Sequence, residues 1–189
     1  MLKSEARKIY RQKRAAITAR EQRIWDDLLL IRFQQLSLPP LHTVFSYAAI
    51  ESRKEIGTDA IVGYLEFSNP GLKIAYPIYD HLTAEMKAVW VNDNTFFAIN
   101  PQGISEPEQG VLADPEDLDI ILVPLLCFDS AGYRVGYGKG VYDKFLKKVR
   151  PDALKIGLSY FDPVPNIDDT SEFDVSLDYC ITPQRIYEF

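Results

Sequence analysis

The chain has 189 residues, of which 47% are hydrophobic and 25% are charged, and its formal net charge is −6 at pH 7. This size and composition indicate a single globular domain over residues 1–189 and exclude a chain that is disordered throughout. No apolar run reaches the ~18–20 residues that a membrane span needs. The N-terminus is charged from its third residue and lacks the apolar centre of a signal peptide. We therefore expect a soluble, cytoplasmic protein that acts as a monomer.

The charge is unevenly distributed along the chain. Residues 1–23 hold eight basic and two acidic side chains, a net of +6, so the remaining residues carry −12. A net acidic protein is a poor general binder of nucleic acid, because phosphate contacts supply most of the non-specific affinity. The basic segment can hold a smaller anion, or it can be the solvated face of an amphipathic helix.

The cysteines and histidines exclude several kinds of site. Cys127 and Cys180 both lie among apolar residues, which predicts two buried thiols and neither a disulfide framework nor a zinc site. His42 and His81 lie outside any pattern that pairs a nucleophile with a base. Hydrolysis by a Ser-His-Asp or Cys-His arrangement is therefore not indicated.

The first half of the chain begins with two predicted helices. Residues 2–16 form an amphipathic helix whose basic stripe is Lys3, Arg7, Arg11 and Arg14. Thr18 and Glu21 have the spacing of a capping box for a second helix, which we expect to run to about residue 36. The remaining elements of this half are a strand at 42–48, a helix capped by Thr58 and ending at 67, strands at 72–79 and 86–91, and an irregular stretch at 92–117.

The second half predicts the centre of a sheet. Residues 118–126 are a continuous apolar run, typical of a strand that is buried on both faces. A glycine-rich loop follows, then a helix at 141–149 and strands at 154–158 and 178–182. The alternation predicts an α/β fold, a Rossmann-like three-layer sandwich with a largely parallel central sheet flanked by helices. Ligands bind beyond the carboxyl ends of such strands, so we expect the glycine-rich loop at the binding edge.

The glycine-rich loop is the segment FDSAGYRVGYGKGVYD at residues 128–143. Its alternating glycines allow backbone N–H groups to approach a phosphate, and the helix that follows adds a partial positive charge. Lys139 and Arg134 add full charges. The spacing matches neither the Walker pattern nor G-x-G-x-x-G, so a phosphate cradle and a flexible surface loop both remain open.

Three other residues of this loop have local explanations. Asp129 and Gly132 have the spacing of a type I turn, with Asp at the first position and Gly at the fourth. Asp143 falls in the first turn of a predicted helix, where a carboxylate favours the helix dipole. It can equally serve as a Mg²⁺ ligand beside bound phosphates.

The run VPLLCFDSAGYRVGYGKGVYDKFL resembles the signature of the 5-formyltetrahydrofolate cyclo-ligase family. Four other segments lie in the order of that family: KSEAR at 3–7, EIGT at 55–58, GISEP at 103–107, and FDVSLDYCITP near the C-terminus. The resemblance covers essentially the whole chain. It implies an ATP-dependent closure of 5-formyltetrahydrofolate to 5,10-methenyltetrahydrofolate, with release of ADP and phosphate and a requirement for Mg²⁺.

The resemblance also implies roles for individual residues. Catalysis would rest on the charges of Lys139 and Arg134. Folate would contact Ile50 and Glu55, together with the loop residues Tyr137, Gly138, Lys139, Gly140 and Val141. ATP would contact Lys3, Arg7, Arg134, Val135, Gly136, Tyr137, Gly138, Lys139, Gly140, Val141 and Tyr142. The Mg²⁺ ligands would be Asp143 and Asp174. Val141 and Phe173 depart from the family pattern, in which an aromatic residue and a histidine are usual.

Two other functions stay open on the residues alone. One is a non-catalytic nucleotide or folate binder that kept the fold. The other is an α/β sugar-phosphate enzyme or isomerase whose substrate phosphate occupies the loop. Release of ADP that depends on folate would separate the cyclo-ligase activity from both of these alternatives.

Overall fold

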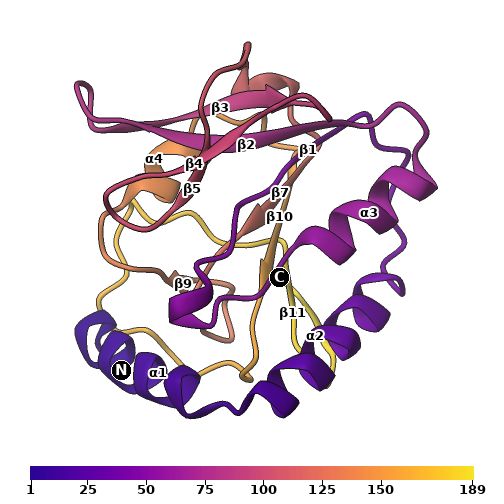
Figure 1. The fold of residues 1–189 in the computed structure, drawn as a ribbon. Coiled ribbons are helices and arrows are strands. Elements are labelled where there is room, and N and C mark those ends of the chain that lie inside the picture. Colours follow the sequence, from indigo (N-terminus) through magenta and orange to yellow (C-terminus); the bar gives the residue numbers. More distant parts are fainter.

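One eight-stranded sheet runs through the computed structural model, which describes residues 1–189 (Figure 1). The strands lie in the order β12-β11-β10-β7-β1-β2-β3-β6. Their bounds are β1 Thr43–Phe45, β2 Lys73–Asp80, β3 Glu85–Val91, β6 Leu112–Ala113, β7 Ile120–Val123, β10 Leu154–Leu158, β11 Tyr179–Ile181 and β12 Ile186–Glu188. The five strands from β11 to β2 are parallel, and β12, β3 and β6 are antiparallel additions at the two ends. The prediction of a largely parallel central sheet is confirmed.

Helices cover both faces of this sheet, which gives the three layers that the sequence predicts. They are α1 Lys3–Ala16, α2 Ala19–Phe33, α3 Asp59–Ser68 and α4 Val141–Leu146, with short 3-10 turns η1 Glu51–Arg53 and η2 Pro115–Asp117. Phe33 of α2 and Leu65 of α3 share a buried cluster with Leu122 of β7. Phe145 of α4 stacks on Phe45 of β1 in a second cluster, on the opposite side. None of these helices is long and apolar enough to cross a bilayer.

The first helix stands apart from those two layers. Ala6 and Tyr10 of α1 pack with Cys127 and Val135 in a smaller third cluster. These two partners belong to the hairpin of β8 Cys127–Phe128 and β9 Arg134–Val135. Helix α1 therefore lies against the segment that carries the glycine-rich loop (Figure 1).

Local signals in the sequence account for several details. The capping box of α2 is present, since the Thr18 hydroxyl accepts from the Glu21 N–H at 3.2 Å and the Glu21 carboxylate accepts from the Thr18 N–H at 2.8 Å. Asp129 is structural, because its Oδ1 accepts the N–H groups of Ala131 and Tyr133 at 3.0 Å each. Gly132 closes that turn at φ +84°, a backbone angle that favours glycine. Both cysteines are buried and free.

Other boundaries differ from the sequence prediction. Helix α2 ends at Phe33 instead of residue 36, and α4 ends at Leu146 instead of residue 149. The apolar run at 118–126 is a strand only over Ile120–Val123, because Pro124 has no N–H to donate to the ladder. Strand β12 was not predicted, and the stretch expected to be irregular contains the hairpin of β4 Phe97–Ile99 and β5 Ser105–Pro107 as well as β6.

Thr58 occupies the N-cap position of α3, as predicted, but its side chain makes no capping hydrogen bond. The Thr58 hydroxyl instead donates to the Tyr47 carbonyl at 2.9 Å and accepts from the Ser46 hydroxyl at 2.8 Å. Thr58 thereby ties α3 to the segment that follows β1.

Candidate active site

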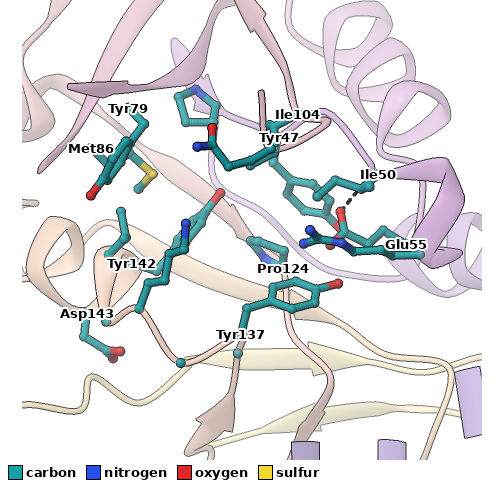
Figure 2. A pocket seen from close by; sticks show the side chains of 18 of the residues that line it. Tyr47, Ile50, Glu55, Tyr79, Met86, Ile104, Pro124, Tyr137, Tyr142 and Asp143 are labelled. Atoms are coloured by element: carbon teal, nitrogen blue, oxygen red, sulfur yellow. Dashed lines mark hydrogen bonds between the residues drawn. The ribbon is translucent and has the colours of Figure 1, made fainter. Parts of the chain in front are cut away.

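A cavity of about 430 Å³ opens where the segments after β1 and β7 meet the glycine-rich loop (Figure 2). Tyr47 and Ile50 follow β1, and Pro124 follows β7. The opposite wall comes from β2, β3 and the β4–β5 hairpin. The cavity therefore lies beyond the carboxyl ends of the parallel strands, at the edge where ligands bind in such sheets.

Helix α1 and the glycine-rich loop form one side of the cavity. Arg7 Nε donates to the Gly136 carbonyl at 3.0 Å. Gly138 has φ +97°, and a Cβ at that position would lie 3.2 Å from the Arg7 guanidinium carbon. A side chain there would strain the backbone and press on Arg7, so Gly138 is required by both conformation and space.

Lys3 lies one turn before Arg7 and forms an ion pair across the chain. Its Nζ is 2.6 Å from each carboxylate oxygen of Asp174. The Ser171 N–H also donates to Asp174 Oδ2 at 2.6 Å. Burial opposes ionisation of Asp174, but the hydrogen bonds from Lys3 and Ser171 outweigh it and lower its pKa below the ordinary value.

A second ion pair fixes the start of α4. Arg134 Nη2 donates to Asp143 Oδ1 at 2.8 Å, and the Val175 N–H donates to the same oxygen at 3.1 Å. Arg134 Nη1 donates to the Val175 carbonyl. Burial lowers the pKa of Arg134, and the Asp143 charge opposes that shift, so the guanidinium stays charged.

The two carboxylates differ in their capacity to hold a metal ion. Both Asp174 oxygens accept hydrogen bonds from protein groups, whereas Asp143 Oδ2 makes no hydrogen bond. No group of three or more His, Cys, Asp or Glu side chains could hold a metal by itself. Mg²⁺ usually needs only one or two carboxylates when phosphate oxygens and water complete its shell, so Asp143 suits it better than Asp174.

Glu55 forms the far side of the cavity. Its Oε2 accepts from the Ile50 N–H at 2.8 Å, which is the dashed line in Figure 2. The residue is 7% exposed, so this carboxylate is held in a largely desolvated position. Lys54 precedes it in the left-handed conformation at φ 48°, and this turn directs the chain from η1 back toward the cavity.

Tyrosines line the space between the two sides. Burial, and then the Glu55 charge, raise the pKa of Tyr137 to about 12. The same two causes raise the pKa of Tyr142. Both phenols therefore stay protonated near neutral pH and can donate hydrogen bonds. Lys139 Nζ lies 5.8 Å from the centre of the Tyr79 ring and makes no ion pair or hydrogen bond, so its charge is free for a ligand.

The structure brings almost all the predicted site residues to this one cavity. Its lining includes Lys3, Arg7, Ile50, Glu55, Arg134, Gly136, Tyr137, Gly138, Lys139, Gly140, Val141, Tyr142, Asp143 and Asp174. Val135 is the exception, because its side chain is buried against α1.

Sequence reasoning missed Tyr47, which follows β1, and these residues of the opposite wall: Tyr79, Met86, Asn100, Gln102, Ile104 and Glu106. The GISEP segment was the one signal that pointed there, since it contains Ile104 and Glu106.

Comparisons with known proteins found similar sequences and similar solved structures. The 5-formyltetrahydrofolate cyclo-ligase of Mycoplasma genitalium is 37% identical over 68 residues, a match that covers 35% of this chain and 41% of that protein. The Escherichia coli K12 enzyme of the same name is 24% identical over 190 residues, covering 95% of this chain and 99% of that protein. The solved structure of Aquifex aeolicus 5,10-methenyltetrahydrofolate synthetase superposes with a TM-score of 0.79 at 27% identity, covering 100% of this chain and 93% of that one.

The family model described as the 5-formyltetrahydrofolate cyclo-ligase family matches residues 2–183. That range contains every residue that lines the cavity, from Lys3 to Asp174 in sequence order. The chain belongs to the 5-formyltetrahydrofolate cyclo-ligase family.

Proposed function

We propose that this chain uses ATP to close 5-formyltetrahydrofolate to 5,10-methenyltetrahydrofolate, with release of ADP and phosphate. One observation carries the proposal: a single cavity has cations and a glycine-rich loop on one side and a buried carboxylate with aromatic walls on the other. Such a cavity suits a polyphosphate and a flat, hydrogen-bonding heterocycle in contact with each other.

The ATP phosphates would lie against the glycine-rich loop. Lys139 makes no ion pair or hydrogen bond, only a cation–π contact with Tyr79, so its ammonium can approach the transferred phosphate without breaking a hydrogen bond. Lys3 and Arg7 would contact ATP from α1, where their spacing of four residues places them on one face. Arg134 already holds Asp143 and the Val175 carbonyl, so we assign it mainly to fixing Asp143 beside the phosphates.

The folate would lie toward Glu55. A carboxylate can accept two parallel hydrogen bonds, which matches the paired donors on the edge of a pterin ring. Oε2 of Glu55 is held by the Ile50 N–H, and this fixes the plane of the carboxylate before substrate arrives. Tyr137, Tyr142 and Ile50 provide the flat and apolar surfaces that such a ring would contact.

The chemistry needs position and charge, and no covalent nucleophile from the protein. The formyl oxygen attacks the γ-phosphorus, the bond to the bridging oxygen breaks, and ADP leaves. The neighbouring nitrogen then attacks the formyl carbon and loses its proton, and phosphate departs with the former formyl oxygen. Lys139 neutralises charge that develops on the transferred group, and the loop N–H groups hold it in line. These roles of Lys139 and of the loop N–H groups explain how a cavity without histidine can support the reaction.

A Mg²⁺ ion fits the donor set on one side of the cavity. We propose that Asp143 would hold it through the oxygen that makes no hydrogen bond, with Asp174 a weaker second ligand because Lys3 occupies both of its oxygens. When bound, the ion would neutralise phosphate charge.

We also propose that the chain works as a monomer in the cytoplasm on these small molecules. One chain supplies every residue around the cavity. Two free thiols suit a reducing compartment.

The test is to incubate the purified chain with ATP, Mg²⁺ and 5-formyltetrahydrofolate, and to measure ADP and the absorption of the methenyl product. We expect both to appear together and neither to appear when ATP or the folate is omitted. Folate binding without ADP release would instead indicate a non-catalytic binder. ADP release that does not depend on folate would show that the substrate is a different one.

A further inference from the structure

Arg14, in the last turn of α1, is a buried cation without an acidic partner. The residue is 5% exposed and takes part in none of the ion pairs of the structure. Its Nε is buried and has no hydrogen-bond partner. A buried guanidinium without a carboxylate is expensive in free energy, so stability alone gives no reason for it. Buried charges without an opposite charge are expected where function requires them.

The contacts of Arg14 reach two of the segments that form the cavity. Its Nη1 donates to the Tyr137 hydroxyl at 3.0 Å, and its Nη2 donates to the Leu125 carbonyl. Tyr137 belongs to the glycine-rich loop, and Leu125 follows Pro124 at the end of β7. Arg14 does not line the cavity itself, so it acts from behind the glycine-rich loop and the end of β7.

The direction of these hydrogen bonds determines where the Tyr137 proton can point. Arginine can only donate, so the Tyr137 oxygen accepts from Arg14 and its own proton is left for another acceptor. Glu55 is the carboxylate whose charge acts on Tyr137, and Figure 2 shows the Tyr137 ring and the Glu55 side chain in the same part of the cavity. Because the pKa of Tyr137 is raised to about 12, this proton is present at neutral pH.

The end of α1 also holds the segment that carries Glu55. Lys54 Nζ donates to the Ala15 carbonyl at 2.7 Å and to the Ile17 carbonyl, next to the left-handed turn that precedes Glu55. Residues 14–17 thus contact both segments of the site. Arg14 contacts Tyr137, and the carbonyls of Ala15 and Ile17 contact Lys54, the neighbour of Glu55. The relative position of the two site residues depends on this shared support.

We infer that Arg14 is a positioning residue for the folate half of the reaction. It fixes the Tyr137 hydroxyl so that the phenol proton is presented to Glu55, the residue that holds the folate. The inference rests on the proposed function, since it assigns Arg14 to the substrate of that reaction.

The test is a double-mutant cycle on kcat/KM for 5-formyltetrahydrofolate at saturating ATP. The variants are Arg14→Met, which keeps the unbranched apolar part of the side chain and removes the guanidinium, Tyr137→Phe, which removes only the hydroxyl, and the two together. We expect each single variant to lose about 10- to 100-fold. The double variant should lose no more than the worse single variant, because Arg14 acts through the hydroxyl that Tyr137→Phe removes. Lys8→Met is the matched control on α1, since Lys8 is exposed and makes no hydrogen bond, and it should stay within about twofold.

Each outcome of the cycle supports or overturns a specific statement. The positioning role would be overturned, with the parent still active, by either of two results. One is a loss of kcat/KM in the double variant equal to the product of the two single losses. The other is an Arg14→Met variant with the kcat/KM of the parent. A parent that forms no methenyl product would overturn the proposed function, and the inference with it. If circular dichroism shows that Arg14→Met does not fold, Arg14→Lys takes its place in the same cycle. Arg14→Lys keeps the charge but cannot hold both partners, and its loss should likewise vanish in the Tyr137→Phe background.

Discussion

Substitution of Asp143 separates a structural role from a metal-binding role, because its two oxygens have different surroundings. Oδ1 accepts from Arg134 at 2.8 Å and from the Val175 N–H at 3.1 Å, whereas Oδ2 accepts from no protein group. A structural role depends on Oδ1. A role in holding Mg²⁺ depends on the negative charge and on Oδ2.

The expected loss of stability follows from the burial of the pair. The side chain of Arg134 is 4% exposed and that of Asp143 is 26% exposed. Removal of one partner of a fully buried ion pair costs about 3–5 kcal/mol, and partial exposure of Asp143 reduces this to about 2–3 kcal/mol for Asp143→Ala. For a domain of this size, that corresponds to a fall of about 4–12 °C in Tm. Asp143→Asn retains an oxygen that can accept from Arg134, so it should cost about 1 kcal/mol.

The assay measures Tm by circular dichroism and ADP release as a function of Mg²⁺ concentration. We expect Asp143→Asn to lower activity and to shift the Mg²⁺ requirement to higher concentration, with only a small change in Tm. Asp152→Asn is the control, because that carboxylate is 79% exposed and does not line the cavity. An unchanged Mg²⁺ dependence in Asp143→Asn would refute the metal-binding role and leave Asp143 as a structural partner of Arg134.

Four further substitutions test other parts of the site and the fold. Lys139→Ala should raise the barrier by about 2–4 kcal/mol, measured as kcat/KM, and a variant within twofold of the parent would remove Lys139 from the phosphate site. Glu55→Ala should weaken folate binding or turnover by about 2–3 kcal/mol, while ATP affinity measured by calorimetry stays the same. Arg7→Ala should weaken ATP binding far more than folate binding. Equal losses of ATP affinity in the two variants would contradict the division of the cavity into an ATP side and a folate side. Burial opposes ionisation of Asp119, but two backbone N–H groups and Arg150 lower its pKa below the ordinary 3.8. The stability it contributes is therefore complete above pH 3.8 and is lost as pH falls through the lower folded value, so Asp119→Asn should flatten the acid side of the curve of unfolding free energy against pH.

The sequence predicts those parts of the fold whose causes are local. The Thr18 and Glu21 capping box and the Asp129 turn each depend on residues within four positions, and both occur as predicted. The buried strand at Ile120–Val123 was visible as an apolar run because both of its faces are covered. Thr58 stands at the predicted N-cap position, but its hydroxyl bonds to residues 11 and 12 positions earlier and not to the helix N–H groups, which no local pattern could indicate.

The residues of the cavity could likewise be predicted only where a local pattern in the sequence marks them. The glycine-rich loop could be recognised because its composition is unusual and continuous. Tyr47, Tyr79 and Met86 could not, since each lies in or beside a strand and resembles an ordinary core residue in sequence. Arg14 appeared as one of four equivalent cations in a basic stripe. Only the packing of α1 against the β8–β9 hairpin shows that Arg14 is buried while Arg11 is exposed.

The placement of α1 predicts that nucleotide binding and the stability of this helix are coupled. Its buried apolar contacts are few, chiefly Ala6 and Tyr10, whereas Lys3 and Arg7 face the site from the same side. A ligand that binds only when α1 is docked stabilises the docked state by mass action. Amide hydrogen exchange in α1 should therefore slow on addition of Mg²⁺-ATP, by more than exchange in α3, which lies in the main core. The Arg7→Ala variant should show less of this protection at the same ATP concentration. Equal protection of α1 and α3 by ATP would mean that α1 is an ordinary part of the core, and its cations would then be a fixed wall of the site.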